Sequence, residues 1–366
     1  MTEGPFRVLR WSAESLGAAR AHRWVASPGA AAGPLRLAVV QGPGEDAAAL
    51  AARAQQALSG PETRDLRGEH GAYFTDAPAG PGQLAALFPS EGLRGAPRIA
   101  RLVQDAAQRA RSTWTSLAAL GIHPSLAAGH SAGELAAATA LGLLDLDVDA
   151  LVRIGADIDA ADSAPVALLS VLGAPEGHVR ELLRAGAGLY LCADDSPRHQ
   201  LLGGEAERVR EAATALAAAG ALCRELPWPI SAHTPLFRPF AEALHARFHA
   251  AAVQRPDACL YSSAEARPFP WEDPPAARML LRNQWLGTVR FRETVEAMYA
   301  SGARAFVELP GRQGLAGYVT DTLGPRPHLS LALSSPDTRE LAHLAAALWV
   351  HHLPVDVARL DAALLG

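Results

Sequence analysis

The chain has 366 residues, of which 49% are hydrophobic and 19% charged, and a formal net charge of −5 at pH 7. This composition predicts a globular protein with one large domain and a smaller one, and excludes the basic surface that nucleic-acid binding requires. No apolar run is long enough for a membrane span, so we expect no membrane partner. The three cysteines, Cys192, Cys223 and Cys259, lack the spacing of a metal site, so we expect buried free thiols in a reducing cytoplasm.

Residues 1–81 predict a small N-terminal α/β linker. A strand is expected over 35–41, and a helix over 45–58, where apolar residues recur at helical spacing. The residues before 35 are punctuated by Gly, Ala and Pro without a clear period, and 59–81 is rich in turn-forming residues. No residue of this region stands in a catalytic pattern, so we expect it to support the domain that follows.

Residues 82–330 predict the main α/β domain, and residues 331–366 a C-terminal segment. A strand over 83–88 precedes Pro89-Ser90-Glu91-Gly92, a loop able to sit over a site. A helix over 98–120 leads to a short apolar strand that ends at Gly129. Further helices are expected from 132 to about 141, over 148–160, 239–250, 291–300 and 338–351, and strands over 260–263 and from 305. The stretch leading to 283–285 is predicted to be a loop.

A subdomain is predicted within this main domain, over residues 164–226. Strands are expected over 166–173, 188–193, 200–204 and 223–227, with helices over 175–185 and 205–219. This β-α-β-β-α-β order is that of the ferredoxin-like split βαβ unit.

One motif stands out, Gly129-His130-Ser131-Ala132-Gly133, after the short strand and before an Ala-rich helix. It has the G-x-S-x-G pattern of the nucleophile elbow, in which the serine occupies a strained strand-to-helix turn. Glycines are needed on both sides because neighbouring side chains would collide there. The turn predicts an exposed Ser131 Oγ with the following backbone N–H groups directed at the group under attack.

His233 is the expected base for this serine. It lies where a loop meets a helix, and Thr234-Pro235 after it favours a turn. Histidine titrates near neutral pH, so it can accept the proton of a serine hydroxyl without a large pKa shift. No Asp or Glu stands in an obvious third position, so a backbone carbonyl could orient the ring and give a dyad rather than a triad.

Four segments occur in a recognisable order: the Phe88-Pro-x-x-Gly92 loop, the Gly-His130-Ser131-x-Gly133-Glu elbow, Ser231-Ala-His233, and Val289-Arg-Phe with Phe306-Val-Glu. Over about residues 83–330 the sequence resembles the malonyl-CoA:acyl-carrier-protein transacylase family, which includes the acyltransferase domains of fatty-acid and polyketide synthases. It most resembles the iterative synthases of polyunsaturated fatty acids and enediynes. The resemblance implies an α/β-hydrolase-like large subdomain with an inserted ferredoxin-like subdomain, and an active site between them.

The resemblance also implies roles for individual residues. Ser131 would carry the acyl group, His233 would be the general base, and the backbone N–H groups of Glu91 and Ala132 would form the oxyanion hole. The implied substrate-binding residues are His130, Arg153, Ala156, Ser231 and Asn283. No cofactor would be bound, because the acyl group arrives on the phosphopantetheine of CoA or of an acyl carrier protein. The implied partners are that carrier protein, acyl-CoA and flanking synthase domains.

Two positions depart from the family pattern. Glu91 stands where the family usually has Gln, although a hole built from backbone N–H groups tolerates this change. Ala156 stands where the family has the arginine that pairs with the malonyl carboxylate. Losing such a partner costs on the order of 2–5 kcal/mol, so we expect an acyl group without a carboxylate. Arg153, one turn earlier on the same predicted helix, either reaches into the site or is solvated.

Two alternatives to acyl transfer stay open. A thioester hydrolase would use water as the second acceptor and strip acyl groups from carriers. A degenerate acyltransferase domain would have no activity and would act as a spacer in a synthase. Intact Ser131 and His233 argue against the second alternative, whereas Glu91 and Ala156 favour it.

Overall fold

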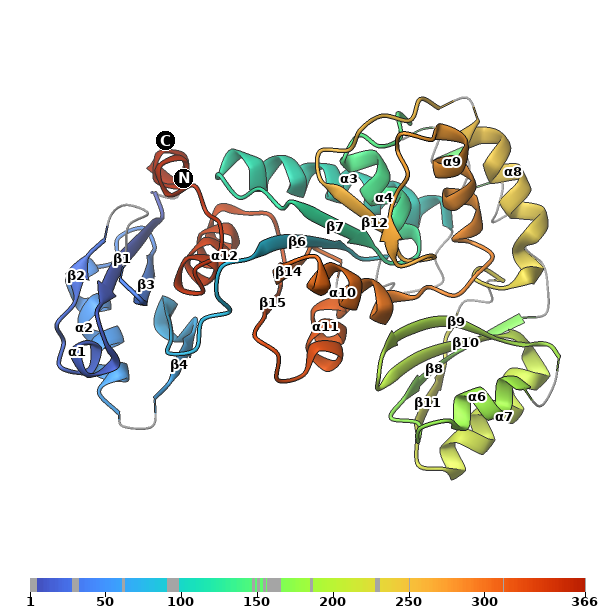
Figure 1. Ribbon diagram of the computed structural model, residues 1–366, viewed down its shortest axis with the longest axis horizontal. Coiled ribbons are helices and arrows are strands. Elements are labelled where there is room, and N and C mark those ends of the chain that lie inside the picture. The colour runs from blue at the N-terminus through green and yellow to red at the C-terminus, as the bar shows by residue number, and fades with distance from the viewer. Residues whose placement is uncertain are drawn as a thin grey trace.

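The computed structural model describes residues 5–27, 33–60, 63–90, 99–146, 149, 152–153, 156, 166–184, 187–227, 231–249, 251–311 and 313–365. These residues form three sheets of five, four and six strands. In Figure 1 the five-stranded sheet lies at the left, the six-stranded sheet at the centre and the four-stranded sheet at the lower right. The fold is mixed α/β, as the sequence predicts.

The six-stranded sheet positions the nucleophile. Its strands in spatial order are β13 (Arg267–Pro268), β12 (Cys259–Ser262), β7 (Leu126–Gly129), β6 (Gln83–Phe88), β14 (Ala303–Glu308) and β15 (Leu329–Ala332). The pairs from β12 to β15 are parallel, and β13 adds an antiparallel edge. Because parallel strands end at the same edge of a sheet, the loops after β6 and β7 meet. The backbone N–H of His130 donates to the carbonyl oxygen of Phe88 at 2.9 Å, which joins the two loops.

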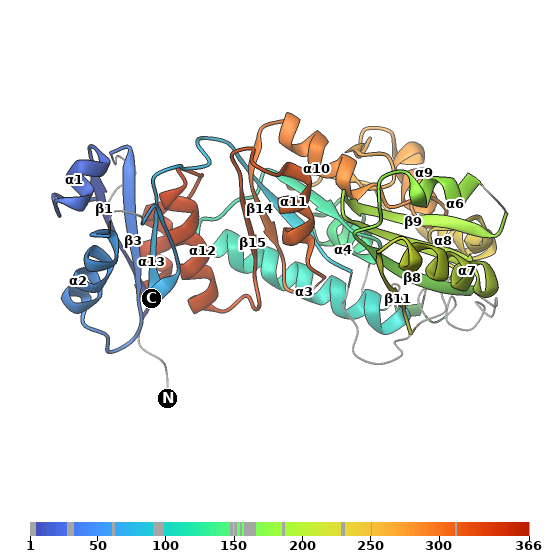
Figure 2. The ribbon, with the colours of Figure 1, turned by 90° about the horizontal axis from the view of Figure 1, so that it is seen from below.

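Helices cover both faces of this sheet. Along β6, Ala86 and Phe88 belong to the core on one face, and Ala85 and Leu87 to the core on the other, as the two-residue period of a strand requires. Figure 2 shows α3 (Ile99–Ala119) on one side and α10 (Phe291–Ala300) with α11 (Leu315–Leu323) on the other. Burial on both faces explains why the strands read as short, uniformly apolar runs rather than as alternating ones.

The stretch predicted as a loop before 283–285 contains a helix, so that prediction was wrong. The helix α9 (Pro274–Asn283) begins at Asp273, whose carboxylate accepts the backbone N–H of Ala276 at 3.1 Å. Proline at the first helical positions costs no intrahelical hydrogen bond. Its buried face, formed by Ala277, Leu280 and Leu281, packs beside α8 (Arg238–Phe248). Asp273 and the two prolines at the start of the helix read as a turn in the sequence, although Ala277, Leu280 and Leu281 have helical spacing.

The ferredoxin-like order is confirmed. The elements are β8 (Val166–Leu172), α6 (His178–Arg184), β9 (Leu189–Ser196), β10 (His199–Glu205), α7 (Ala206–Ala218) and β11 (Leu222–Glu225). The sheet order β11-β8-β10-β9 is antiparallel throughout. Strand β9 joins the main domain, because Val289 donates to the carbonyl of Cys192 at 2.8 Å and accepts the N–H of Asp194 at 2.9 Å. The end of β9 is thereby held against the segment that leads into α10.

The N-terminal and C-terminal segments pack together. The five-stranded sheet has the order β2-β1-β3-β5-β4, formed by β1 (Arg7–Ala13), β2 (Val25–Ala26), β3 (Leu35–Gln41), β4 (Asp65–Arg67) and β5 (Ala72–Thr75). It also carries α1 (Leu16–Arg20) and α2 (Ala47–Leu58). Helix α12 (Thr338–Val350) packs on β3, and α13 (Val357–Leu365) packs on β1 through the Arg10–Asp361 ion pair. The sequence showed no period before residue 35, and β1 is recognisable only from its pairing with β3.

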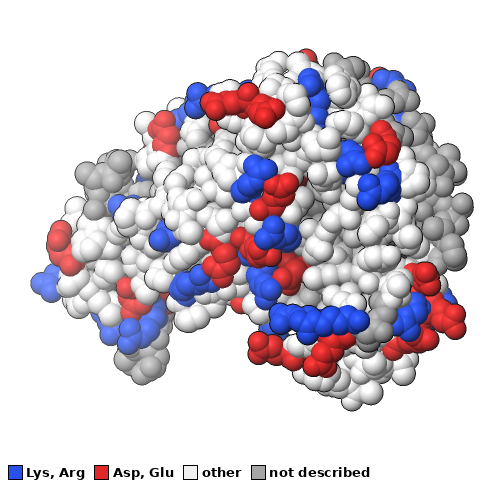
Figure 3. Space-filling model, turned by 45° about the vertical axis from the view of Figure 1, so that its right-hand side comes forward, with Lys and Arg blue, Asp and Glu red and all other residues white. Residues whose placement is uncertain are grey.

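The structure also tests the predictions on the cysteines, the membrane and the surface charge. All three cysteines are free, but only Cys192 is buried, and the expectation of burial was wrong for the exposed Cys259 at the start of β12. Among the described residues, no helix is long and apolar enough to cross a membrane. On the face drawn in Figure 3, basic and acidic side chains lie side by side rather than in one extended patch of a single sign.

Candidate active site

Ser131 occupies the strained turn that the G-x-S-x-G pattern predicts. It follows β7 and precedes α4 (Ala132–Ala140). Its backbone angles, φ 55° and ψ −124°, lie in a region that residues other than glycine rarely adopt. A side chain on Gly129 would collide with the backbone of Glu134, and one on Gly133 would collide with the carbonyl of Phe88. Both glycines are therefore required by close backbone approach, and they bring the start of α4 against the end of β6.

Ser131 and His233 form a hydrogen-bonded pair. Ser131 Oγ lies 2.7 Å from His233 Nε2, and His233 Nδ1 lies 2.9 Å from the carbonyl oxygen of Gln284. A carbonyl only accepts, so Nδ1 carries the proton and Nε2 is left to accept from the serine hydroxyl. The ring also stacks on Trp285, with centroids 6.1 Å apart. The histidine is thus fixed in the tautomer that a general base needs, and a backbone carbonyl takes the place of a third acidic residue.

His233 is held in its neutral form at neutral pH. Burial and then the electrostatic effect of His130 lower its pKa to about 4, against smaller opposing effects from hydrogen bonds to Gln284 and Gly287 and from the charge of Asp195. The expectation that His233 needs no large pKa shift was therefore wrong, because burial of the ring penalises its charged form.

A buried hydrogen-bond network surrounds His130, the residue before the nucleophile. His130 Nε2 lies 2.6 Å from Asp195 Oδ1, and His130 Nδ1 lies 2.7 Å from Gln313 Nε2. Gln313 Oε1 accepts the backbone N–H of Ser90 at 2.7 Å. On the far side, Asp195 Oδ2 lies 2.9 Å from His199 Nδ1, whose Nε2 lies 2.9 Å from Ser170 Oγ. The network therefore connects the loop after β6, the elbow and the end of β9.

Two further polar side chains support the elbow. Glu134, in the first turn of α4, accepts from Ser262 Oγ at 3.0 Å and from the backbone N–H of Ser263 at 2.8 Å. Burial raises the pKa of Glu134 to about 8, so the group is largely protonated at neutral pH. The Gln284 amide lies between the carbonyl of Ser131, at 3.3 Å, and the indole N–H of Trp285, at 2.9 Å, and it satisfies both in one orientation.

A serine in a strained turn, hydrogen-bonded to a neutral histidine, provides the nucleophile and the general base that acyl transfer through a covalent intermediate requires. Residues 108–348 match the acyl transferase domain family, and this span is more than half of the 366 residues. The chain belongs to this family.

Individual relatives agree with this membership. The chain is 28% identical over 231 residues, 61% of its length and 71% of the relative, to the malonyl CoA-acyl carrier protein transacylase of Bacillus subtilis. It is 27% identical over 220 residues, 59% of its length, to one polypeptide of the polyunsaturated fatty acid synthase of a Thraustochytrium species, but spans only 8% of that polypeptide. The solved acyltransferase domain of an iterative polyketide synthase in enediyne biosynthesis superposes with a TM-score of 0.70, at 25% identity, over 95% of this chain and 96% of that one.

Three other residues that the sequence predicted for the site are described by the structure: Ala132, Ser231 and Asn283. Ala132 is the first residue of α4, where backbone N–H groups have no intrahelical acceptor, as an oxyanion hole requires. Ser231 is buried two residues before His233, and its carbonyl accepts from Thr234 Oγ1 at 2.6 Å. Asn283 ends α9, and its side-chain oxygen accepts from Arg282 Nη1 at 2.7 Å. It is the next residue, Gln284, that contacts His233.

The remaining predictions concern the oxyanion loop and the carboxylate position. Glu91 lies outside the described residues, as does most of the helix predicted over 148–160. Arg153 and Ala156 are described, and both are helical and exposed.

Sequence reasoning missed three side chains of the network: Asp195, His199 and Gln313. They lie on β9, β10 and the loop before α11, and no spacing relates them to the elbow. Only the ferredoxin-like topology brings β9 and β10 to His130. The sole available signal was Asp194-Asp195, two acids directly after the strand predicted over 188–193.

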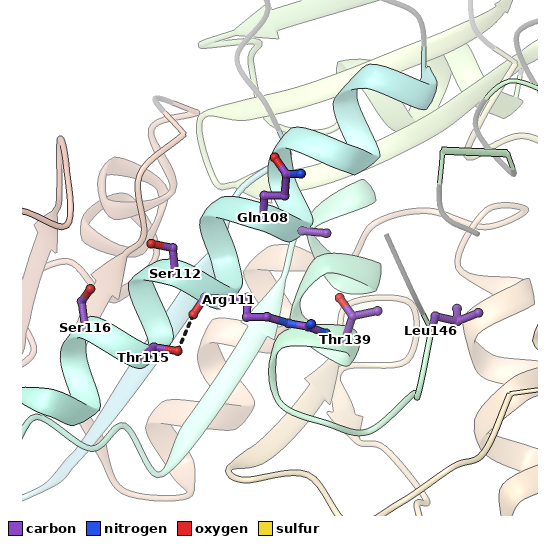
Figure 4. A pocket seen from close by; sticks show the side chains of 8 residues that line it. Gln108, Arg111, Ser112, Thr115, Ser116, Thr139 and Leu146 are labelled. Atoms are coloured by element: carbon purple, nitrogen blue, oxygen red, sulfur yellow. Dashed lines mark hydrogen bonds between the residues drawn. The ribbon is translucent and has the colours of Figure 1, made fainter. Parts of the chain in front are cut away.

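A cavity of about 410 Å³ lies away from the dyad. Figure 4 shows Gln108, Arg111 and Ser112 of α3 beside Thr139, which is at the opposite end of α4 from Ser131. With a rise of about 1.5 Å per residue, Thr139 lies roughly 10 Å along the helix from its start. Among the described residues, no group of three or more His, Cys, Asp or Glu side chains could hold a metal ion.

Proposed function

We propose that this acyl transferase domain moves an acyl group from a thioester, on CoA or a carrier protein, to the phosphopantetheine thiol of an acyl carrier protein. The observation that carries the proposal is the 2.7 Å contact between Ser131 Oγ and His233 Nε2, with Nδ1 tied to a backbone carbonyl. An assembled dyad in a strained elbow also argues against a degenerate spacer, because neither the strain nor the buried histidine helps stability.

The first half-reaction acylates the serine. Ser131 Oγ attacks the thioester carbonyl while His233 Nε2 takes the hydroxyl proton, and the carbonyl oxygen becomes an oxyanion. The backbone N–H of Ala132 stabilises that oxyanion, together with the backbone N–H of Glu91. The intermediate then expels the thiolate, which takes the proton from His233, and leaves an ester on Ser131.

The second half-reaction reverses these roles. The thiol of the carrier's phosphopantetheine arm gives its proton to His233 and attacks the ester carbonyl. Ser131 Oγ leaves and recovers the proton from His233 Nε2. No bound cofactor takes part, because the phosphopantetheine belongs to the substrates. Flanking synthase domains and a reducing cytoplasm are part of the same proposal, and the three free cysteines suit that compartment.

We further propose that the enzyme is not specific for malonyl groups. Ala156 occupies the position of the family's carboxylate-binding arginine, and an unpaired carboxylate entering a protein site loses water without compensation. Arg153, which is helical and exposed, is the other candidate for a carboxylate partner. Acetyl-type or longer unbranched groups are therefore the expected substrates.

Intact-mass measurement after exposure to a panel of acyl-CoAs tests the proposal. The wild-type protein should gain one acyl mass, and Ser131→Ala should gain none. Adding an acyl carrier protein to the isolated acyl-enzyme should transfer the mass to the carrier faster than water releases it. Release to water at the same rate with and without a carrier would instead identify a thioester hydrolase. No acyl mass from any thioester would reject both enzymatic functions.

A further inference from the structure

Asp195 is a buried carboxylate close to the nucleophile that no step of the proposed reaction uses. It is 3% exposed, and both of its oxygens are occupied by imidazole nitrogens, His130 Nε2 at 2.6 Å and His199 Nδ1 at 2.9 Å. Burial by itself would raise the pKa of Asp195, but the hydrogen bonds that the His130 and His199 rings donate to its two oxygens act in the opposite direction and lower it. The carboxylate is therefore ionised at neutral pH.

The hydrogen bonds show that His130 does not neutralise this charge. The backbone N–H of Ser90 can only donate, so Gln313 Oε1 is the acceptor and Gln313 Nε2 is the donor toward His130 Nδ1. Nδ1 then carries a lone pair, and the ring holds its single proton on Nε2, which donates to Asp195. His199 Nε2 meets the hydroxyl of Ser170, which can donate, so this ring needs no charge either.

The residue next to Asp195 in the chain, Asp194, is a second acid, and it pairs with Arg292 at 2.6 Å. The ring of His199 stacks on that of Tyr318, with centroids 4.9 Å apart. Burial raises the pKa of Tyr318, and the charges of Asp195, Glu308 and Asp321 raise it further. The charge of Asp195 also acts on His233, where it raises the pKa against the larger effect of burial. The dyad therefore lies within reach of this negative charge.

We propose that Asp195 is a specificity-determining residue that makes the site discriminate against acyl groups ending in a carboxylate. The inference rests on the proposed acyl transfer and names its substrate class as uncharged, on grounds independent of Ala156. A malonyl group on Ser131 holds its carboxylate close to Oγ, and Asp195 is hydrogen-bonded to the ring of His130, the residue before Ser131. At roughly 10 Å and an effective dielectric of about 20, two like charges repel enough to change a rate about tenfold.

Asp195→Asn removes the charge and keeps the hydrogen bonds. The asparagine oxygen accepts His130 Nε2–H, and its amide donates to His199 Nδ1 once that ring shifts its proton to Nε2 and donates to Ser170 Oγ. Asp194→Asn is the matched control, because it removes one negative charge at the adjacent position, outside the network. Malonyl-CoA and acetoacetyl-CoA are the probes, since their acyl groups are similar in shape and differ in charge.

The measurement is the single-turnover acylation rate of Ser131 with each probe. Wild type should react faster with acetoacetyl-CoA, and Asp195→Asn should raise the malonyl-to-acetoacetyl rate ratio about tenfold. Asp194→Asn should change the ratio by less than threefold. Equal losses with both probes in Asp195→Asn, or a wild type that prefers malonyl-CoA, would overturn the proposal.

A binding measurement separates this proposal from the catalytic one. In a Ser131→Ala background, calorimetric affinities for malonyl-CoA and acetoacetyl-CoA are compared with Asp or Asn at position 195. A selective gain in malonyl-CoA affinity supports the role of Asp195 even if no acyl-enzyme forms. An unchanged affinity ratio, together with an unchanged rate ratio, rejects that role while leaving acyl transfer intact.

Discussion

The low pKa of His233 predicts an unusually wide acid range for acylation. If His233 is the base, the rate follows the fraction of the ring that is neutral. With a pKa of about 4 instead of the ordinary 6.5, the ring is about 97% neutral at pH 5.5 rather than about 9%. The acylation rate at pH 5.5 should therefore stay within about 10% of the rate at pH 7.5, and fall by half only near pH 4.

The same shift predicts the direction of a stability change. Folding lowers the pKa of His233 because the buried ring resists protonation, so the unfolded chain binds more protons between pH 6.5 and pH 4. The stability contributed by the neutral ring is complete above about pH 6.5 and is lost as the pH falls toward 4, by on the order of 3 kcal/mol. Replacing His233 with alanine should flatten this part of the stability profile.

Rapid-quench acylation followed by intact mass gives the rate, and urea unfolding at each pH gives the stability. Rates are compared only at pH values where unfolding shows the protein to be folded. His233→Ala should acylate at least about 10²-fold more slowly at every pH, with no midpoint in this range. A wild-type midpoint near pH 6.5 would refute the burial argument, and a fast His233→Ala variant would remove His233 from the mechanism.

Three further predictions follow from the elbow and its surroundings. Ser131→Ala should lose all acyl mass gain while keeping the wild-type circular dichroism spectrum; residual acylation would place the nucleophile elsewhere. Ala156→Arg should raise the malonyl-to-acetyl acylation ratio by something like 10- to 100-fold, because it restores a cation for the carboxylate; a wild type that already prefers malonyl should lose that preference in Arg153→Ala. Glu134→Gln should be at least as stable as wild type in urea at pH 8, because burial raises the pKa of Glu134 to about 8 and the native state disfavours its charged form; a loss of more than about 2 kcal/mol would mean that the site requires the anion.

The parts of the fold that sequence predicts best are those specified by local chemistry. Gly129 and Gly133 predict the elbow correctly, because backbone contacts exclude any side chain at these two positions. Ser131 has the positive φ that the pattern requires. The order of strands and helices in the ferredoxin-like subdomain also reads directly from its periodicity. In contrast, α9 was predicted as a loop because its first residues read as a turn, and β1 went unnoticed because it is recognisable only from its pairing with β3.

The candidate site divides in the same way. Ser131 and His233 are recognisable because their residue types and turns are unusual in themselves. Gln284 acts on His233 through a backbone carbonyl, which any residue type would supply, so side-chain patterns pointed to its neighbour Asn283 instead. Asp195, His199 and Gln313 are polar residues of common types at strand ends and in a loop. Only their hydrogen bonds in the folded protein mark them as part of the site, so sequence alone could not identify them. A carboxylate that would be unremarkable on a surface acts on the dyad only because β9 carries it, buried, to the residue before the nucleophile.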